Sequence, residues 1–546
     1  MNRIRFFLIF FCGALVACKK DNVPKITDTS LAFTVNGVYN GSLTYKGVNL
    51  KPKIQLNFSE AVDSTSFSQA IKLTNSGFAV PLSFQLSSDK LHLDLIPKNN
   101  LMGLAAYQLA INPILKTTSG GVLLNPITIS LNTGIDSTDK FPRISDDELL
   151  TKIQQQTFAY FWDFGHPTSG MARERNNSGD VVTTGGTGFG IMAMIAAVNL
   201  GFITRADANA RIQKIINFLK TADKFHGVFP HWMNGNTGKV IPFSTKDDGA
   251  DLVETSFLME GLLVARQYFS GTLTSEQTLR NDVNQLYQSV EWDWFRQNDS
   301  QQLYWHWSPN YNWEMNMPVS GWNEALMVYV LAASSPTHSI PKSVYDNGWA
   351  KNGSIKNGQT FYGTVLPLGP NLGGPLFFEH YSFMALNPLK LSDANANYNQ
   401  QVKAHTKINL AYVISNPKKF YGYSADCWGL TASDISGGYT ASSPNNDGGF
   451  IAPTAAISSL PYTPEESMRA IRFFYYKLGD QLWGTYGFKD AFSLDQPWFA
   501  DSYLAIDQGP EMVMIENYRS QLIWNLFMSC PEVQAGLQKL QFQIIN

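Results

Sequence analysis

The sequence predicts a multidomain protein in which a small all-β sandwich precedes a large all-α toroid of paired helices. Three observations support this prediction. The chain has 546 residues, which is long enough for two to four domains. Apolar residues recur with period two up to about residue 133, and with helical spacing after residue 145. All 13 Trp lie at or beyond Trp162, in the helical part.

The composition is rich in aromatic rings and poor in charge. Aromatic residues make up 13% of the chain and charged residues 16%, whereas about 25% of an average domain is charged. So many rings exclude an intrinsically disordered chain. The net charge of −3 and the absence of a Lys/Arg block argue against a nucleic-acid partner.

The N-terminus has the pattern of an export signal. Arg3 and Arg5 precede an apolar run over residues 6–17, which is too short to span a bilayer. The run ends Leu15-Val16-Ala17-Cys18, which resembles a bacterial lipobox and implies cleavage before Cys18 and acylation of its thiol. The alternative is an ordinary signal peptide, 1–17, with an incidental Cys.

We therefore expect an exported outer-membrane lipoprotein, on the cell surface or the periplasmic face, whose only membrane contact is its lipid. Residues 18–30 would form the tether, and Lys19-Lys20-Asp21 resembles the surface-export signals of Bacteroidetes lipoproteins. Cys427 and Cys530 would remain in a compartment that permits disulfides. The pair predicts either one bridge or two separate buried thiols.

Residues 31–133 alternate between apolar and polar positions in several short runs. Examples are 54–58, 82–86, 91–95, 107–111 and 127–131, separated by clusters of Asn, Gly, Pro and Ser. Short alternating strands at this spacing predict a β-sandwich. The segments 57–63 and 95–97 resemble bacterial Ig-like modules that precede many secreted enzymes. We expect a spacer or docking module, with sugar binding as an alternative.

Residues 134–144 resemble a linker, and a helical pattern begins at Ser145. Ser145 and Glu148 form a capping box, in which each side chain satisfies a backbone N–H of the other residue. Similar starts occur at Thr204, Thr274 and Thr463. Helices are predicted near 145–164, 188–200, 204–222, 251–269, 274–295, 320–334, 395–414, 464–482 and 511–528.

The predicted helical domain spans 145–546 and has long, aromatic-rich loops between its helices. This alternation favours a toroid, with one end covered by loops and a concave site beneath them. An irregular α bundle is the alternative. No repeat of 20–50 residues is evident, so an open solenoid is disfavoured.

Four acids crowd the predicted start of one helix. Asp247 and Asp248 lie in the preceding loop, while Asp251 and Glu254 are three residues apart and share a helix face. They could simply be helix caps that favour the helix dipole. Mutual repulsion among them could instead raise the pKa of one carboxyl and make it a general acid.

A second cluster combines rings with amides and an acid. Its members are Trp305, His306, Trp307, Asn310, Trp322, Asn323 and Glu324. Flat rings stack on pyranose C–H faces while polar groups bind hydroxyls, so the cluster suits a sugar. The alternatives are a buried aromatic core for the rings and a helix cap for Glu324, which we expect in the first turn of an apolar helix.

Further loops also mix ionisable groups with aromatic residues. The candidates for substrate binding in them are His231, Trp232, Asp248, Glu379, His380, Tyr381, Asp426 and Trp428. The segment 498–503 has the same character. Asp507 and Glu511 follow it and could instead hold loop backbone at the rim.

Other chemistries lack a signature in this sequence. The glycines at 186, 188 and 190 are an incomplete dinucleotide fingerprint, and no strand is expected before them. No Walker loop, His-Glu-x-x-His or Gly-x-Ser-x-Gly occurs, and the eight His are scattered. We expect no cofactor and no metal.

Several of these motifs together resemble one family. They are 186–192 (Gly-Thr-Gly-Phe-Gly-Ile-Met), 225–232, 247–254, 303–310, 321–324, 374–381, 426–433 and 505–510. They resemble the glucoamylase-like domain of bacterial β-1,2-glucanases, which is often labelled "putative glucoamylase". The match spans about 145–540.

The resemblance implies an (α/α)6 barrel that hydrolyses β-1,2-glucan with inversion. We expect the partner to be a poly- or oligosaccharide and the protein to be a monomer. Glu324 would be one catalytic carboxyl, and Asp251, or Asp247 and Glu254, its partner. The alternatives are a glucoamylase acting on another glucan, a non-catalytic glycan-binding lipoprotein, and a uronic-acid lyase. A lyase would need a basic cleft, whereas these loops are acidic.

Overall fold

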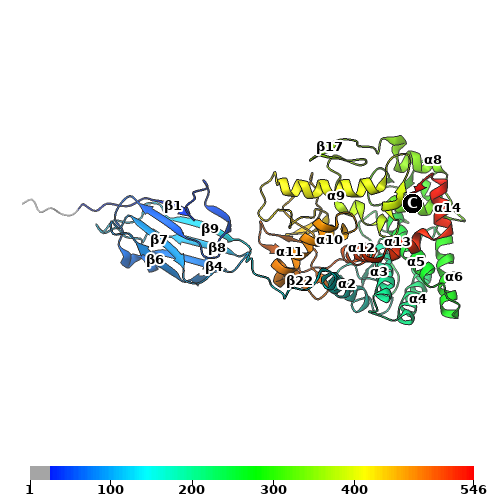
Figure 1. Cartoon of the computed structure of the whole chain (residues 1–546), viewed down its shortest axis with the longest axis horizontal. Coiled ribbons are helices and arrows are strands. Elements are labelled where there is room, and N and C mark those ends of the chain that lie inside the picture. The colour runs from blue at the N-terminus through cyan, green and yellow to red at the C-terminus, as the bar shows by residue number, and fades with distance from the viewer. Residues whose placement is uncertain (1–24, 546) are drawn as a thin grey trace, which may run out of the picture. The chain divides into compact units, whose positions relative to one another are not determined.

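The computed structural model describes residues 25–545 and divides into two compact units after Gly134 (Figure 1). The expected signal segment 1–17, the lipid-anchor residue Cys18 and part of the expected tether lie outside the described residues. No helix among those described is long and apolar enough to cross a membrane.

The first unit is a sandwich of two sheets with the strand orders β1-β3-β7-β6 and β2-β9-β8-β4-β5. Every neighbouring pair is antiparallel except β2 and β9, which run parallel. The strands are β1 Leu31–Val35, β2 Thr44–Val48, β3 Ile54–Phe58, β4 Ile71–Asn75, β5 Phe78–Val80, β6 Leu82–Leu86, β7 His92–Pro97, β8 Ala106–Ile111 and β9 Ile127–Thr133.

The alternation in the sequence corresponds to the two faces of these strands. In β3 the side chains of Ile54, Leu56 and Phe58 are buried, and the residues between them are not. β8 and β9 repeat the pattern, with Leu109 and Ile129 fully buried. A strand whose apolar residues alternate buries one face, and two such sheets enclose a shared core.

The second unit begins with a strap rather than a free linker. Residues 135–144 lie along α11 Pro464–Leu482, where Lys140 N–H donates to the Tyr476 carbonyl and Phe141 packs on Tyr475. The strap leads into α2 Asp146–Trp162. There the capping box of Ser145 and Glu148 is present as predicted.

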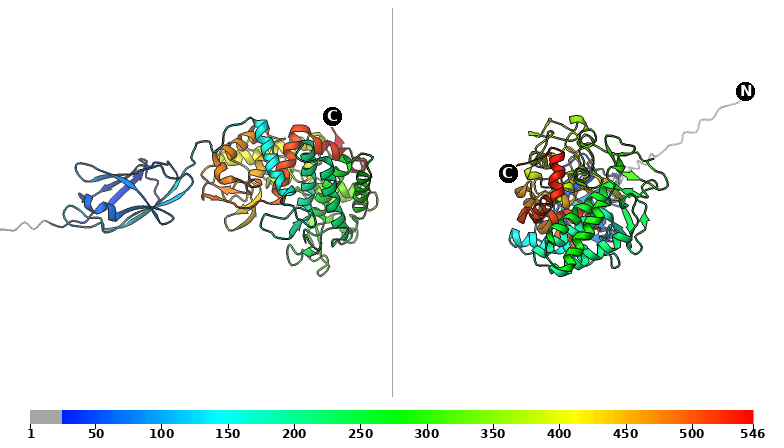
Figure 2. Two further views of the ribbon diagram at one scale, coloured as in Figure 1. Left: turned by 90° about the horizontal axis from the view of Figure 1, so that it is seen from below. Right: turned by 90° about the vertical axis from the view of Figure 1, so that its right-hand side faces the viewer.

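Helices dominate this second unit (Figures 1 and 2). The remaining ones are α3 Thr184–Asn199, α4 Arg205–Thr221, α5 Leu252–Tyr268, α6 Thr274–Gln288, α7 Leu326–Ser334, α8 Lys342–Val344, α9 Tyr398–Ser415, α10 Pro453–Ser458, α12 Ala505–Ser520, α13 Leu522–Met528 and α14 Pro531–Lys539. The apolar helices α3, α5 and α7 are almost entirely buried.

Helix α3 packs between α5 and α12 at the centre of this unit. The glycines of its motif allow the contact: a Cβ on Gly188 would lie 2.0 Å from the Phe257 carbonyl oxygen, and one on Gly261 2.2 Å from that of Gly188. The expectation of no preceding strand is wrong, because β10 Val181–Thr183 leads directly into α3. These glycines serve close helix packing.

Three predicted helices have different limits in the structure. The segment 274–295 ends as a helix at Gln288, and 320–334 begins only at Leu326. The segment 511–528 is two helices, because Gln521 adopts a left-handed backbone between α12 and α13. Helix α12 also starts earlier than expected, at Ala505, and Pro510 is its sixth residue.

The two cysteines among the described residues are buried free thiols. Cys427 lies in a loop and Cys530 caps α14. The alternative of two separate thiols therefore holds in this structure.

Candidate active site

A cavity of about 410 Å³ opens in the helical domain, where the N-terminal end of α3 meets the starts of α5 and α7. Its size is typical of a ligand pocket. Three glutamates line it, Glu174, Glu254 and Glu324, and the last two are candidates for catalysis. Much of the rest is aromatic: Trp232, Phe243, Phe257, Trp305, Phe377, Tyr381 and Tyr439.

Glu254 is held by the N-terminus of α3. Its Oε2 accepts the Gly185 N–H at 2.8 Å, and Thr183 Oγ1 lies at 3.4 Å. A helix N-terminus carries unpaired N–H groups and a positive dipole end, so it favours the carboxylate. A Cβ at position 185 would lie 2.7 Å from Glu254 Oε2, so a larger residue there would displace this carboxylate.

Asp251 caps α5 and pairs with two histidines behind the cavity wall. Its Oδ1 accepts the N–H groups of Val253 and Glu254 at 3.0 and 2.9 Å. Its Oδ2 lies 3.0 Å from His231 Nδ1 and 3.5 Å from His306 Nε2. Asp251 and His306 meet because β13 Ala250–Asp251 pairs with β15 His306–Trp307 in that register.

Both histidines carry charge at neutral pH. Burial lowers the pKa of His231, but Glu254, Asp251 and Asp247 outweigh burial and raise it to about 9. Burial likewise opposes the charge of His306, and Asp247 and Asp251 raise its pKa to about 9. Although burial disfavours the Asp251 carboxylate, the two histidines hold its pKa well below the usual range.

The same cluster is also the one set of described residues whose ligand atoms suit a metal ion: His231, Asp247 and Asp251 each offer an atom, all within 4.8 Å of one another. Metal binding needs neutral imidazole. A histidine with a pKa of about 9 is protonated at neutral pH and donates to the carboxylates instead.

Glu324 lies two residues before α7, so it precedes the first turn in which it was expected. Its backbone carbonyl accepts the Ser382 hydroxyl, which fixes the loop, while its side chain lines the cavity. Burial raises the pKa of Glu324 to about 7, and the nearby charges of Glu254 and Asp251 add to the effect. A carboxyl with this pKa can hold a proton near neutral pH.

Six of the candidates line the cavity: Glu254, Glu324, His231, Trp232, Trp305 and Tyr381. Asp247, Asp251 and His306 lie behind them as the ion cluster, with 3.2 Å between His306 Nε2 and Asp247 Oδ2. The cap interpretation therefore describes Asp251 well. The structure brings these nine residues together from five segments of the chain, at 231–232, 247–254, 305–306, 324 and 381.

Four candidates for sugar contact are instead buried structural groups. Glu379 is fully buried and bound to His405 and Gln401, and His380 contacts Ser459. The ring of Trp322 packs against Trp349 and Phe383, and Trp428 donates towards the Glu466 carbonyl. Protein atoms surround these four side chains, and none of them lines the cavity. A sugar contact by any of them stays a prediction.

The other candidates are not part of the cavity lining. Asp248 accepts from the Asn310 amide at 2.7 Å, and Asn323 Oδ1 accepts the Ala325 N–H. Trp307 packs on Phe225, His226 and Trp294, and the exposed Asp426 pairs with Arg469. A sugar contact at these positions remains a prediction.

Several lining residues were missed by sequence reasoning: Glu174, Arg175, Thr183, Phe243 and Tyr439. The signal available was the charged triplet 173–175 before a Gly-containing turn, and the Gly437-Gly438 turn before Tyr439. Neither pattern distinguishes a cavity wall from a solvated surface loop.

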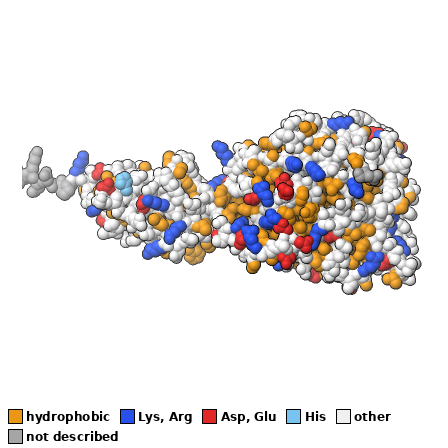
Figure 3. Space-filling view, in the orientation of Figure 1, with side chains coloured by type: hydrophobic (Ala, Val, Ile, Leu, Met, Phe, Trp, Pro, Cys, Tyr) orange, Lys and Arg blue, Asp and Glu red, His pale blue; other side chains and the backbone are white. Residues whose placement is uncertain are grey.

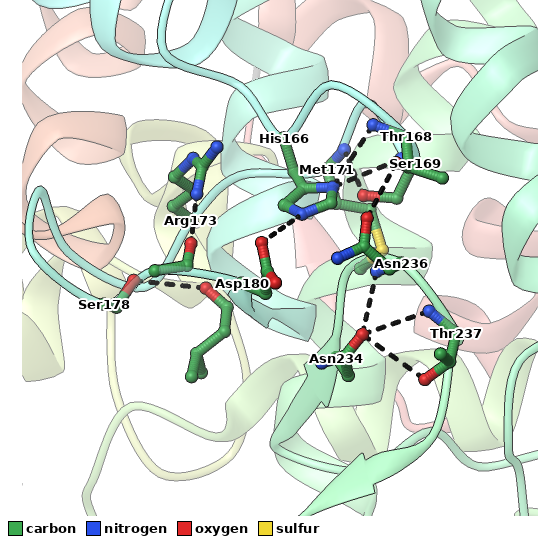
Figure 4. Close-up of polar contacts among 12 residues, drawn as sticks. His166, Thr168, Ser169, Met171, Arg173, Ser178, Asp180, Asn234, Asn236 and Thr237 are labelled. Carbon is green, nitrogen blue, oxygen red and sulfur yellow. Dashed lines mark hydrogen bonds and ion pairs between the residues drawn. The ribbon is translucent and has the colours of Figure 1, made fainter.

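The loop that carries Arg175 is fastened at both ends (Figure 4). His166 Nε2 donates to Asp180 Oδ1 at 3.1 Å, and its Nδ1 accepts the N–H groups of Thr168 and Ser169. Burial lowers the pKa of His166, in keeping with this neutral arrangement. Asn234 and its neighbours tie the same loop to the hairpin of β11 Trp232–Asn234 and β12 Val240–Ile241.

An arrangement of two buried carboxyl groups, Glu254 and Glu324, in an aromatic cavity of a helical domain indicates the class. It is the arrangement that glycoside hydrolases use, with one carboxyl as acid and a second as base or nucleophile. Family models agree with this class. The one described as "Putative glucoamylase" matches residues 316–531, one described as a protein of unknown function matches 152–252, and a bacterial Ig-like domain matches 31–133.

Solved structures and a curated protein specify the family. A structure of a "putative glucoamylase" from Bacteroides uniformis is 56% identical, with a TM-score of 0.73, covering 74% of this chain and all of that one. The endo-β-1,2-glucanase of Chitinophaga pinensis is 52% identical, with a TM-score of 0.72, covering 73% of this chain and 99% of that one. This chain belongs to the bacterial β-1,2-glucanase family with a glucoamylase-like domain.

A curated relative in Parabacteroides distasonis is named an exo β-1,2-glucooligosaccharide sophorohydrolase acting at the non-reducing end. It is 45% identical over 420 residues, which are 73% of this chain. The aligned part spans 58% of that relative's length.

Proposed function

We propose that this protein is a glycoside hydrolase that cleaves β-1,2-glucan by acid/base catalysis with two carboxyl groups. The observation that carries the proposal is the pair Glu324 and Glu254 in one aromatic cavity. The substrate follows from the endo-β-1,2-glucanase and the sophorohydrolase to which the chain is similar. Both relatives act on β-1,2-linked glucose, by their names.

The environments of the two carboxyls suggest their roles. Glu324 has a pKa raised to about 7, and no cation contributes to that shift, so it is suited to carry the proton given to the glycosidic oxygen. Burial and the charge of Asp251 raise the pKa of Glu254 above its usual value, while His231, the Gly185 N–H and Thr183 oppose this rise by binding the anion. Glu254 is thus suited to accept a proton from the attacking water.

Asp251 and Asp247 act through the histidines in this scheme. Asp251 uses both oxygens on the α5 cap and the imidazoles, so it is a positioning residue rather than the base. It holds His231 charged beside Glu254, where His231 Nε2 lies 3.9 Å from Oε1. The aromatic walls offer flat faces on which a sugar ring can stack.

The decisive experiment incubates the purified protein with α-1,4, β-1,3, β-1,4 and β-1,2 glucans and follows products by chromatography. Release of β-1,2-linked oligosaccharides supports the proposal. Cleavage of another linkage would replace the substrate, and saccharide binding without any release would make the protein a glycan-binding lipoprotein. Inversion predicts that the first product carries the α-anomeric configuration, visible by NMR.

Three further features are proposals of the same kind. The contacts of α3 with α5 and α12, and of α5 with α7, suit the inner ring of an (α/α)6 toroid. Acylation of Cys18 would make the protein an outer-membrane lipoprotein, and metabolic labelling with a fatty-acid probe should be lost in Cys18→Ala. We also expect a monomer, which light scattering can test.

A further inference from the structure

A second hollow of about 590 Å³ adjoins the cavity with the two glutamates. The two spaces share Arg175 and Tyr439 as a partition, because both residues line both of them. The second hollow is also lined by Asn176, Asn177 and Trp498. It therefore continues the cavity in one direction along the surface of the helical domain.

The partition is held in place by ion pairs. Arg175 Nε lies 3.0 Å from Glu174 Oε2, and its Nη1 lies 3.2 Å from Asp434. Asp434 also accepts the Ser502 hydroxyl at 2.5 Å, and its N–H donates to Asp490 at 2.6 Å. A guanidinium with two carboxylate partners is neutralised, so the partition presents little net positive charge.

Hydrogen bonds of Asn176 also hold the walls of the second hollow in place. The Asn176 amide donates to the Asp501 carbonyl at 3.0 Å, and its Oδ1 accepts the Tyr503 N–H at 3.1 Å. This clamp joins the loop of Arg175 to the segment after β25 Trp498–Phe499. The hollow is lined by three segments, 175–177, 434–439 and 498–502, and this clamp joins the first to the third.

The chemistry of the lining suits a neutral polyol. Trp498 is partly exposed and packs edge-on against Phe450 at 5.4 Å, which orients its ring. Asn177 is exposed, and its amide can both donate to and accept from hydroxyls. The one cation among the lining residues, Arg175, is paired with carboxylates, so an anionic polymer has no free positive charge to meet.

We propose that this hollow is a binding subsite for further glucosyl units of the glucan whose scissile bond lies at Glu324. The sugar chain passes the partition of Arg175 and Tyr439, and one glucosyl ring stacks on Trp498. This inference rests on the proposed function and deepens it. It makes hydrolysis depend on chain length, since only a glucan long enough to pass the partition gains the contact.

The test compares Trp498→Ala and Asn177→Ala with the wild type on β-1,2-linked oligosaccharides of increasing length. For long glucans we expect kcat/KM to fall about tenfold in Trp498→Ala, about 1.4 kcal/mol, and less in Asn177→Ala. The shortest oligosaccharide that is cleaved should be hydrolysed within twofold of the wild-type rate. Trp498→Phe should restore most of the loss, because it keeps a ring.

Tyr518→Ala is the matched control, because Tyr518 is an exposed aromatic residue in the last turns of α12 that lines neither hollow. It should leave every length unchanged. Equal losses on all lengths, or no loss on long glucans, would overturn the subsite. Equal melting temperatures of the variants establish that they fold alike.

A binding measurement separates failure of the subsite from failure of the proposed function. Calorimetry with β-1,2-glucan compares Glu324→Gln with the double variant Glu324→Gln/Trp498→Ala, neither of which needs to turn over. Weaker binding by the double variant supports the subsite, and equal binding refutes it. A wild-type protein that binds β-1,2-glucan without cleaving it refutes only the hydrolase proposal, and one that does neither refutes both.

Discussion

Glu324→Gln removes one titrating carboxyl from the cavity and keeps its shape, so it separates the charge of Glu324 from its packing. Glu324 has a pKa of about 7 in the folded protein against 4.5 as its ordinary value. The folded state therefore binds more protons than the unfolded chain between these values, and stability falls as the pH rises from 4.5 through 7. At 1.36 kcal/mol for each pH unit, the loss amounts to about 3 kcal/mol.

Glu324→Gln should not lose stability in this way as the pH rises. We expect Glu324→Gln to be more stable than the wild type by up to about 3 kcal/mol at pH 8, and nearly equal to it at pH 4.5. The assay is denaturant unfolding of both proteins at a series of pH values. Glu314→Gln, an exposed carboxylate in the same region, is the control and should follow the wild type.

The same substitution should abolish the acid function. A general acid contributes about 10²–10⁴ in rate, so hydrolysis should fall by at least that factor while glucan still binds. The wild-type rate should decline above about pH 7, as Glu324 loses its proton. The reasoning is refuted if the variant shows the wild-type dependence of stability on pH, or if it turns over glucan within tenfold of the wild type.

Three other substitutions test the surroundings of the cavity. Asp251→Asn leaves His231 without its carboxylate and should destabilise the domain by about 3–5 kcal/mol, as expected for a broken buried ion pair, measured by urea unfolding. His231 has a pKa of about 9 in the folded protein, against 6.5 as its ordinary value. Its charge therefore stabilises the fold fully below about pH 6.5, and this stabilisation is lost as the pH rises through 9. His231→Gln should flatten the fall in melting temperature between pH 7 and 9. Gly188→Ala places a Cβ 2.0 Å from the Phe257 carbonyl oxygen and should prevent soluble expression. Gly438→Ala is the control, because the nearest atom to its Cβ lies at 4.0 Å, and it should express normally. Equal expression of the two variants would contradict the packing argument.

Capping patterns in the sequence predicted the helix starts that depend on an N-cap side chain. Ser145 and Thr204 cap their helices through side-chain oxygens, as a polar residue ahead of an apolar helical run indicates. Thr274 and Thr463 do not use their side chains as caps: Leu273 is the N-cap of α6, and Thr463 precedes α11 without a side-chain cap bond. Even so, α6 and α11 begin at Thr274 and Pro464, where the sequence pattern predicted them.

The fold distinguishes among four acids that the sequence made equal candidates for catalysis. Asp247, Asp251, Glu254 and Glu324 all had the residue type and context of a catalytic group. Strand pairing then put Asp251 opposite His306, which made it the anion of a buried ion pair. Only Glu254 and Glu324 remained with side chains on the cavity.

The sequence by itself determined the two-part architecture, the family and the neighbourhood of the acidic cluster, because periodicity, capping and motifs are written in residues close along the chain. Tertiary structure alone decided which rings line the cavity and which fill the core. It buried Glu379 and Trp428 among protein groups and brought Arg175 and Tyr439 to the cavity. Burial and charge pairing depend on residues that meet only when the chain folds, and these set the pKa of Glu324.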